Sequence, residues 1–167
     1  MVFIISFTYS QLKEFLMEYL HTMIRVKDLD ANLDFFCNKM GMVEKNRQEN
    51  EKGRFTLVFL HAQDDKDLAE SKSSPLVELT YNWPVEGEEP ETYSVGRSFG
   101  HLAYSVENIY ETCAKLKESG VVINRPPRDG YMAFVKSPEG VSIEFLQKGE
   151  PLEPKEPWLS MENTGSW

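Results

Sequence analysis

Apolar positions recur with helical spacing at two places in the chain, at an offset of 101 − 21 = 80 residues. The segment HTMIRVKDLDANLDFF from His21 aligns without a gap on HLAYSVENIYETCAKL from His101. In both copies apolar residues stand at i, i+4 and i+7, which is typical of the buried stripe of a helix. These residues are Leu29, Leu33 and Phe36 in the first copy and Ile109, Cys113 and Leu116 in the second. The repeat predicts the same strand, turn and helix twice.

Capping residues and β-rich runs complete each copy. Asp28 and Asn108 stand where helix N-caps belong, and Gly41 and Gly120 follow where each helix should end. The β-rich runs lie at 54–60 and 76–81 in the first copy and at 131–135 and 141–146 in the second. We expect an α+β domain over residues 18–148, built of two tandem β-α-β-β-β modules at 18–82 and 98–148.

Other segments lack this periodicity. We expect residues 1–17 to be an N-terminal arm, since Met17 runs into the first strand and would serve as a start itself. The charged run 64–74 and the Pro- and Glu-rich run 83–96 predict surface loops.

The end of the chain, residues 149–167, holds Pro151, Pro154 and Pro157 in a Glu-rich context. Prolines at this spacing exclude a regular helix or central strand, so we expect an extended C-terminal tail. Its tryptophans, Trp158 and Trp167, either dock on a neighbouring surface or are exposed by accident.

Composition and charge narrow the class of protein. Hydrophobic residues make up 41% and charged residues 27%, as in an ordinary globular protein. Lys and Arg number 18 against 27 for Asp and Glu, and a net charge of −9 repels nucleic acid. The opening stretch has neither the basic n-region of a signal peptide nor the length of a membrane span, so no membrane association is expected. Cys37 and Cys113 fall in predicted helices, which favours reduced thiols in a cytoplasmic protein.

Each module presents one histidine and one glutamate on the polar face of its strands: His21 and Glu78 in the first, His101 and Glu144 in the second. A single such residue on a wet face is usually only solvated, but the same types recur at matching positions in both copies. Two imidazoles and two carboxylates together suit a divalent cation. His61 has no counterpart in the second copy and is expected at the surface.

Four stretches resemble the glyoxalase I family, the lactoylglutathione lyases of the vicinal-oxygen-chelate superfamily. They are LHTMIRVKDLDANLDFFCNKMGM from Leu20, VELTYNW from Val77, FGHLAYSV from Phe99 and AFVKSPEGVSIEFL from Ala133. The resemblance implies a glyoxalase/dioxygenase-like fold, with curved sheets around a metal site, and a homodimer with its sites at the interface. His21 and Glu78 of one subunit would then join His101 and Glu144 of the other.

The activity implied by the resemblance is methylglyoxal detoxification. The hemithioacetal of glutathione and methylglyoxal is isomerised to S-lactoylglutathione by proton transfer through a metal-bound enediolate. By resemblance, Glu144 is the catalytic base and Glu78 serves the other enantiomer of the hemithioacetal. The residues that would bind the cosubstrate glutathione are Arg25, Asn82, Arg97 and Arg125, with Arg128 as the alternative to Arg125.

The identity of the metal and the reaction stay open at this point. His21 stands where zinc-using relatives carry glutamine and resembles the nickel or cobalt type, whereas the 64–74 run partly resembles an insertion of the zinc type. We favour nickel over zinc. The alternatives are another enzyme of the superfamily, such as an epimerase or an extradiol dioxygenase, and a non-enzymatic small-molecule-binding protein. A glutamate ligand at Glu78 argues against the dioxygenase, which uses two histidines and one glutamate.

Overall fold

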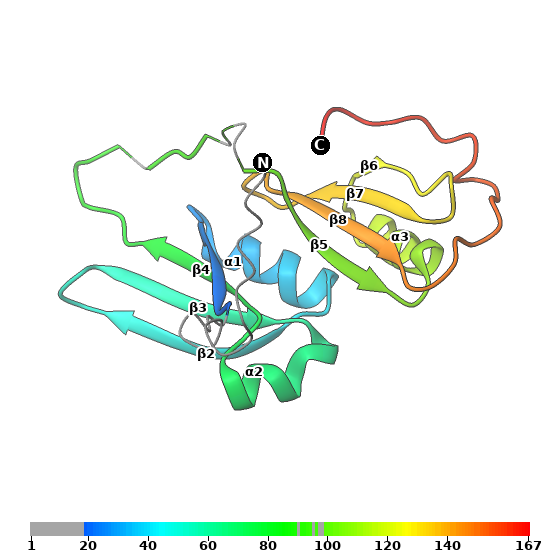
Figure 1. The fold of residues 1–167 in the computed structure, drawn as a ribbon. Helices are drawn as coiled ribbons and strands as arrows, with labels where there is room; N and C mark the ends of the chain where they lie inside the picture. Colours follow the sequence, from blue (N-terminus) through cyan, green and yellow to red (C-terminus); the bar gives the residue numbers. More distant parts are fainter. Residues whose placement is uncertain (1–18, 90, 95, 97–98) are drawn as a thin grey trace, which may run out of the picture.

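The two modules predicted from the repeat form two four-stranded sheets (Figure 1). The computed structural model describes residues 19–89, 91–94, 96 and 99–167. The arm expected at residues 1–17 therefore lies outside the described residues. Among the helices of the described part, none is long and apolar enough to cross a membrane.

The first module runs from β1 to β4. Its elements are β1 (His21–Arg25), α1 (Leu29–Leu33), the π-helical η2 (Asp34–Lys39), β2 (Val43–Asn50), β3 (Phe55–His61), the 3-10 turn η3 (Gln63–Asp65), α2 (Lys66–Lys72) and β4 (Leu76–Asn82). The strand order is β1-β4-β3-β2, in which β1 is parallel to β4 and the other pairs are antiparallel.

The second module repeats this topology. Its elements are β5 (His101–Val106), α3 (Ile109–Glu118), β6 (Ile123–Arg125), β7 (Met132–Lys136) and β8 (Ser142–Gln147). The strand order β5-β8-β7-β6, with β5 parallel to β8, matches the first sheet strand for strand. The predicted α+β fold of two β-α-β-β-β modules is confirmed.

Both predicted N-caps close the first turn of their helices. Oδ1 of Asp28 accepts a hydrogen bond from the backbone N–H of Ala31 at 2.9 Å. Oδ1 of Asn108 accepts from the backbone N–H groups of Tyr110 and Glu111 at 3.1 and 3.2 Å. The helices then differ, because the first changes into the π-helical η2 whereas α3 continues unbroken.

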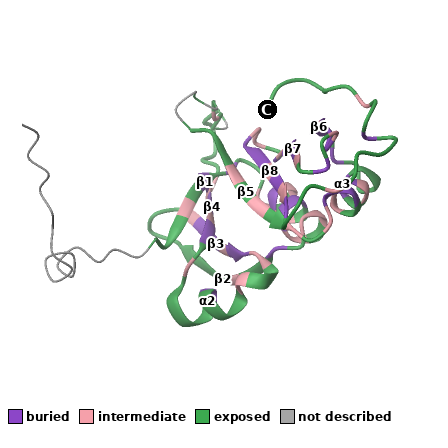
Figure 2. Ribbon diagram, turned by 45° about the vertical axis from the view of Figure 1, so that its right-hand side comes forward, coloured by how far each residue is buried: buried purple, intermediate pink, exposed green. Residues whose placement is uncertain are grey.

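The buried side chains of both modules form one hydrophobic cluster, and Figure 2 shows buried residues along β3, β4 and β8. Polar contacts also link the modules: Oε1 of Glu139 accepts from the backbone N–H of Lys27 at 3.2 Å and from Nδ2 of Asn32 at 3.4 Å. Both cysteines are free, and burial raises the pKa of Cys113 to about 12. The core therefore joins the modules while each keeps its own sheet.

The charged run 64–74 is not the loop that its composition predicts, since it contains the end of η3 and all of α2. Ala69 is the buried residue of α2, so the helix has no apolar stripe that periodicity could reveal. The helix ends at Ser73, whose φ of 55° is left-handed and whose backbone N–H donates to the carbonyl of Ala69. The helix therefore has one buried side chain and no amphipathic pattern.

One further expectation changes in the structure, and one open alternative is decided. His61 is not at the surface: it is 4% exposed at the end of β3, and its Nδ1 lies 2.7 Å from the carbonyl oxygen of Ala62. The tail 149–167 contains no helix or strand, yet it packs on the second module, and Trp158 is 5% exposed within the core. Docking is therefore the correct alternative for Trp158.

Candidate active site

His21 and Glu78 meet on the open face of the first sheet. The parallel register pairs Glu78 with Met23, so His21 lies two residues away on the same face. Nε2 of His21 is 3.0 Å from Oε2 of Glu78, and their side chains are 39% and 12% exposed. Phe59 faces Glu78 from β3, and its ring stands edge-on to the imidazole at 5.8 Å. The pair is thus half-covered, with an aromatic ring beside the imidazole.

His101 and Glu144 repeat this arrangement in the second sheet. Glu144 pairs with Ala103 on one side and with Phe134 on the other. Nε2 of His101 is 3.1 Å from Oε2 of Glu144, and their side chains are 42% and 12% exposed. The ring of Phe134 stands edge-on to the imidazole at 5.5 Å. The repeat has therefore preserved the residue types and also their geometry.

The two pairs do not combine within one chain. Among the described residues, no group of three or more His, Cys, Asp or Glu side chains lies close enough to hold a metal ion. Each pair still brings one imidazole nitrogen and one carboxylate oxygen to within 3.0–3.1 Å of each other, and these are donor types that a divalent cation binds. One chain thus carries two separate half-sites.

One hydrogen bond distinguishes the two carboxylates. Oγ1 of Thr80 donates to Oε1 of Glu78 at 3.0 Å. Within the part of the chain that is described, the carboxylate of Glu144 has no side-chain partner other than His101. Glu144 is therefore the less restrained of the two.

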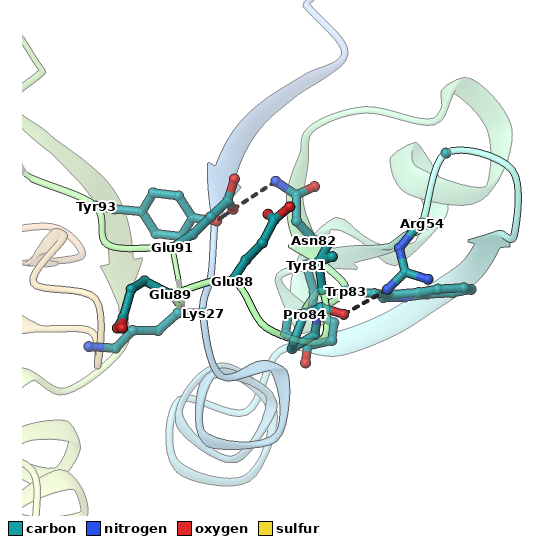
Figure 3. Close-up of a pocket in the computed structure, with 12 residues that line it drawn as sticks. Lys27, Arg54, Tyr81, Asn82, Trp83, Pro84, Glu88, Glu89, Glu91 and Tyr93 are labelled. Carbon is teal, nitrogen blue, oxygen red and sulfur yellow. Dashed lines mark hydrogen bonds between the residues drawn. The ribbon is translucent and has the colours of Figure 1, made fainter.

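A cavity of about 410 Å³ opens between the end of β4 and the segment after it (Figure 3). At its wall, Nδ2 of Asn82 donates to Oε2 of Glu91 at 2.9 Å, and the hydroxyl of Tyr93 donates to the same oxygen. The hydrogen bond from Tyr93 has the largest effect on the pKa of Glu91, which it lowers. The hydrogen bond from Asn82 and the charge of Arg25 lower this pKa further. Burial and the Glu91 carboxylate raise the pKa of Tyr93 to about 12. Arg25 and Asn82 are both expected to bind glutathione, and in this structure both interact with a carboxylate of the chain itself, that of Glu91.

The other expected glutathione-binding residues have different surroundings. Arg97 lies outside the described residues. Arg125 donates from Nη2 to Oδ2 of Asp129 at 2.8 Å and from Nη1 to the carbonyl of Met132. Arg128, its alternative, donates to the carbonyl of Met161 at 2.8 Å in the tail. Both described arginines therefore already hold protein partners.

Residues that the sequence reasoning missed are the phenylalanines beside each imidazole. Phe59 and Phe134 occupy the register positions opposite Glu78 and Glu144. Alignment of the antiparallel strands on the two glutamates would have revealed them, because each phenylalanine is then the cross-strand neighbour of its glutamate.

Comparison with known proteins adds to this geometry. The sequence profile of the Glyoxalase/Bleomycin resistance protein/Dioxygenase superfamily matches residues 18–145. The chain belongs to this superfamily. Within it, the chain is 39% identical over 137 residues to the lactoylglutathione lyase of Neisseria meningitidis, covering 79% of this chain and 91% of that protein. The probable lactoylglutathione lyase of Vibrio cholerae is also 39% identical, over 77% of this chain and 88% of the relative.

Solved structures of the superfamily show the same fold. The trypanothione-dependent glyoxalase I of Leishmania major has a TM-score of 0.67 and is 35% identical, covering 79% of this chain and 87% of that one. The glyoxalase I of Zea mays has a TM-score of 0.65 and is 28% identical, over 81% of this chain and 46% of that one. The resemblance stated from the sequence motifs is confirmed.

Proposed function

We propose that this protein is a lactoylglutathione lyase that isomerises the hemithioacetal of glutathione and methylglyoxal to S-lactoylglutathione. The observation that carries the proposal is the pair of matching half-sites, His21–Glu78 at 3.0 Å and His101–Glu144 at 3.1 Å. The names of the Neisseria and Vibrio relatives support the same activity. It acts on a small molecule, and we infer a cytoplasmic location and no nucleic-acid partner.

The four side chains would hold one divalent metal ion per site. Two imidazoles and two carboxylates leave two positions of an octahedron for oxygen ligands, which suits nickel or cobalt, with zinc as the alternative. When bound, the ion would act as a Lewis acid and stabilise the negative charge that develops on the substrate oxygens. His21 and His101 would serve as neutral nitrogen ligands.

We infer a homodimer, because each chain supplies only two donors to any one place among its described residues. His21 and Glu78 of one protomer would complete a site with the His101–Glu144 pair of its partner. A two-fold axis that joins one first module to one second module generates two such sites per dimer.

Glu144 is the residue we assign as the base that moves the substrate proton between the two carbons. This proton transfer needs a carboxylate that can leave its ligand position and accept a proton. The hydrogen bond from Thr80 restrains Glu78, whereas Glu144 has no equivalent bond in the described part. Glu78 would serve the other enantiomer of the hemithioacetal.

Glutathione would bind where the chain now holds a carboxylate of its own. Asn82 and Arg25 act on Glu91, and a carboxylate of the peptide would take its place between them. Arg97 and Arg125 are assigned as further binding residues. For Arg125 this requires that it exchange or share its ion pair with Asp129.

The test is reconstitution of the full-length protein. The metal is removed with a chelator, and nickel, cobalt or zinc is added back while thioester absorbance is followed with glutathione and methylglyoxal. We expect thioester formation that depends on the added ion and reaches its highest rate with nickel or cobalt. Loss of one metal per site in His101→Ala should accompany loss of activity. No bound metal and no thioester under any condition would overturn the proposal in favour of a binding protein.

A further inference from the structure

The C-terminal tail, residues 149–167, is attached to the second module along its whole length. Its first part is held by the backbone N–H of Leu152, which donates to the carbonyl of Gly130 at 3.1 Å. The hydroxyl of Tyr110 on α3 donates to the carbonyl of Glu153 at 3.0 Å. Trp158 is then buried in the core. The tail, red in Figure 1, therefore follows a defined path over the second module.

Four further hydrogen bonds hold the last part of the tail. Arg128 donates to the carbonyl of Met161 and to Oδ1 of Asn163, both at 2.8 Å. Asn124 and Thr164 exchange two bonds: Nδ2 of Asn124 donates to the carbonyl of Thr164 at 2.8 Å, and the backbone N–H of Thr164 donates to the carbonyl of Asn124 at 2.9 Å. The chain is thus fixed at the edge strand β6 three residues before its end.

The final residue reaches the candidate active site. The indole of Trp167 lies 6.1 Å from the ring of Phe134 at an interplanar angle of 31°. Phe134 is the ring that stands edge-on to His101. Trp167 remains 42% exposed, whereas Phe134 is 6% exposed. Phe134 thus links His101 to Trp167, and it is buried whereas the imidazole and the indole on either side of it are both about two-fifths exposed.

Within the described ranges, the first module has no second aromatic ring of this kind. Phe59 stands edge-on to His21, but no other described aromatic ring contacts Phe59. Among the described residues the indole is therefore a feature of the second half-site, and a site assembled from one half of each kind contains one Trp167.

We propose that Trp167 is a substrate-contacting residue whose indole binds the apolar group carried by the aldehyde part of the substrate. The proposal rests on the lactoylglutathione lyase function given above. A partly exposed indole that packs on Phe134, the neighbour of the His101 imidazole, gains from burial under an apolar group of a ligand held at that imidazole. The structure points to aryl-substituted 2-oxoaldehydes as the substrates that would benefit more than methylglyoxal.

The kinetic test compares Trp167→Ala, Trp167→Phe and the control Leu159→Ala, which removes an exposed apolar side chain from the same tail. Trp167→Ala should lower kcat/KM about 3- to 10-fold for the hemithioacetal of phenylglyoxal, mainly through KM, as expected for one aromatic contact. The loss for methylglyoxal should be smaller, Trp167→Phe should keep most of the preference, and Leu159→Ala should change neither substrate. Equal losses for both substrates, or none, would show that Trp167 only anchors the tail and would overturn the proposal.

A binding measurement provides a readout independent of turnover. S-Benzylglutathione is added to the metal-loaded wild type and to Trp167→Phe, and the difference in tryptophan emission is recorded. We expect the emission of Trp167 to change on binding, so the wild-type response should be smaller in Trp167→Phe. The response that remains in this variant would come from Trp83, which lines the cavity beside β4, and from Trp158. An identical response in both proteins would overturn the proposal. A wild type that lacks turnover would instead refute the proposed function itself, so the two failures are distinguishable.

Discussion

The two modules are nearly identical where the candidate ligands lie and different around them. The imidazole–carboxylate distances are 3.0 and 3.1 Å, and the phenylalanine–imidazole distances are 5.8 and 5.5 Å. In each, the phenylalanine faces the glutamate across an antiparallel strand pair. The recurrence of this constellation in two copies that differ at most surrounding residues supports our proposal that the His–Glu pair is the functional unit of the module.

The surroundings explain how two equal pairs can take unequal roles. In the first module Thr80 holds the glutamate with a hydrogen bond, and a cavity opens beside the end of β4. In the second module the glutamate lacks this bond among the described residues, and the tail brings Trp167 alongside. Under the proposed function, the first half would hold a ligand in place, whereas the second would carry out proton transfer and contact the aldehyde.

The largest expected effect is on turnover. Glu144→Gln should lower kcat by about 10²- to 10⁴-fold, the usual contribution of a general base, while measurable metal remains bound. Glu78→Gln should lower it less. The assay is thioester absorbance combined with metal content by mass spectrometry. Near-normal turnover in Glu144→Gln would remove this residue from the role of base.

The difference between Glu78 and Glu144 is tested by Thr80→Val, which deletes the hydrogen bond to Glu78 with little change of shape. In the Glu144→Gln background it should raise the residual turnover about fivefold, since one hydrogen bond is worth about 1 kcal/mol. Unchanged residual turnover would show that the hydrogen bond does not set the difference between the two carboxylates.

The next expected effect is on the free energy of unfolding, to which the tail contributes through its packing on the second module. Trp158→Ala should lower the free energy of unfolding by about 3–5 kcal/mol, because it empties a core position. Leu159→Ala, one residue on and 49% exposed, should change it by less than about 0.5 kcal/mol. Denaturant unfolding measures both, and equal midpoints for Trp158→Ala and wild type would mean that the tail does not contribute to the core.

The smallest expected effect is a pH dependence of the stability, and it comes from Asp129 in the second module. Burial raises the pKa of Asp129, but hydrogen bonds from Arg125 and from the backbone N–H groups of Met132 and Tyr131 outweigh it and lower the pKa. A lowered carboxylate pKa stabilises the fold above the unfolded-state value and loses this effect as pH falls through the folded-state value. Asp129→Asn should therefore lower the free energy of unfolding by less than about 1 kcal/mol at pH 7. The cost should vanish below the folded-state pKa, and a cost that is constant from pH 7 to pH 2 would contradict this explanation.

Much of the fold was predictable because the duplication repeats local signals. Asp28 and Asn108 identified both helix starts, and strand alternation placed each histidine and glutamate on an open face. Helix α2 was not predictable, since Ala69 alone is buried and leaves no apolar period. The partners of Arg128 were hidden because they lie 33 and 35 residues away in the tail. Docking of Trp167 was one of the two alternatives drawn from the sequence, but its contact with Phe134 was hidden for the same reason, because it depends on tertiary contacts that fix the preceding residues.

The most direct test of the account is complementation between subunits. One variant carries His21→Ala and Glu78→Gln, the other carries His101→Ala and Glu144→Gln, and each bears a different affinity tag. Both homodimers should be inactive, whereas the purified heterodimer contains one site in which all four ligands are intact. We expect about half of the wild-type activity per dimer, because one of two symmetry-related sites is restored. A heterodimer as inactive as its parents would show that the two pairs do not meet across subunits and would contradict the account.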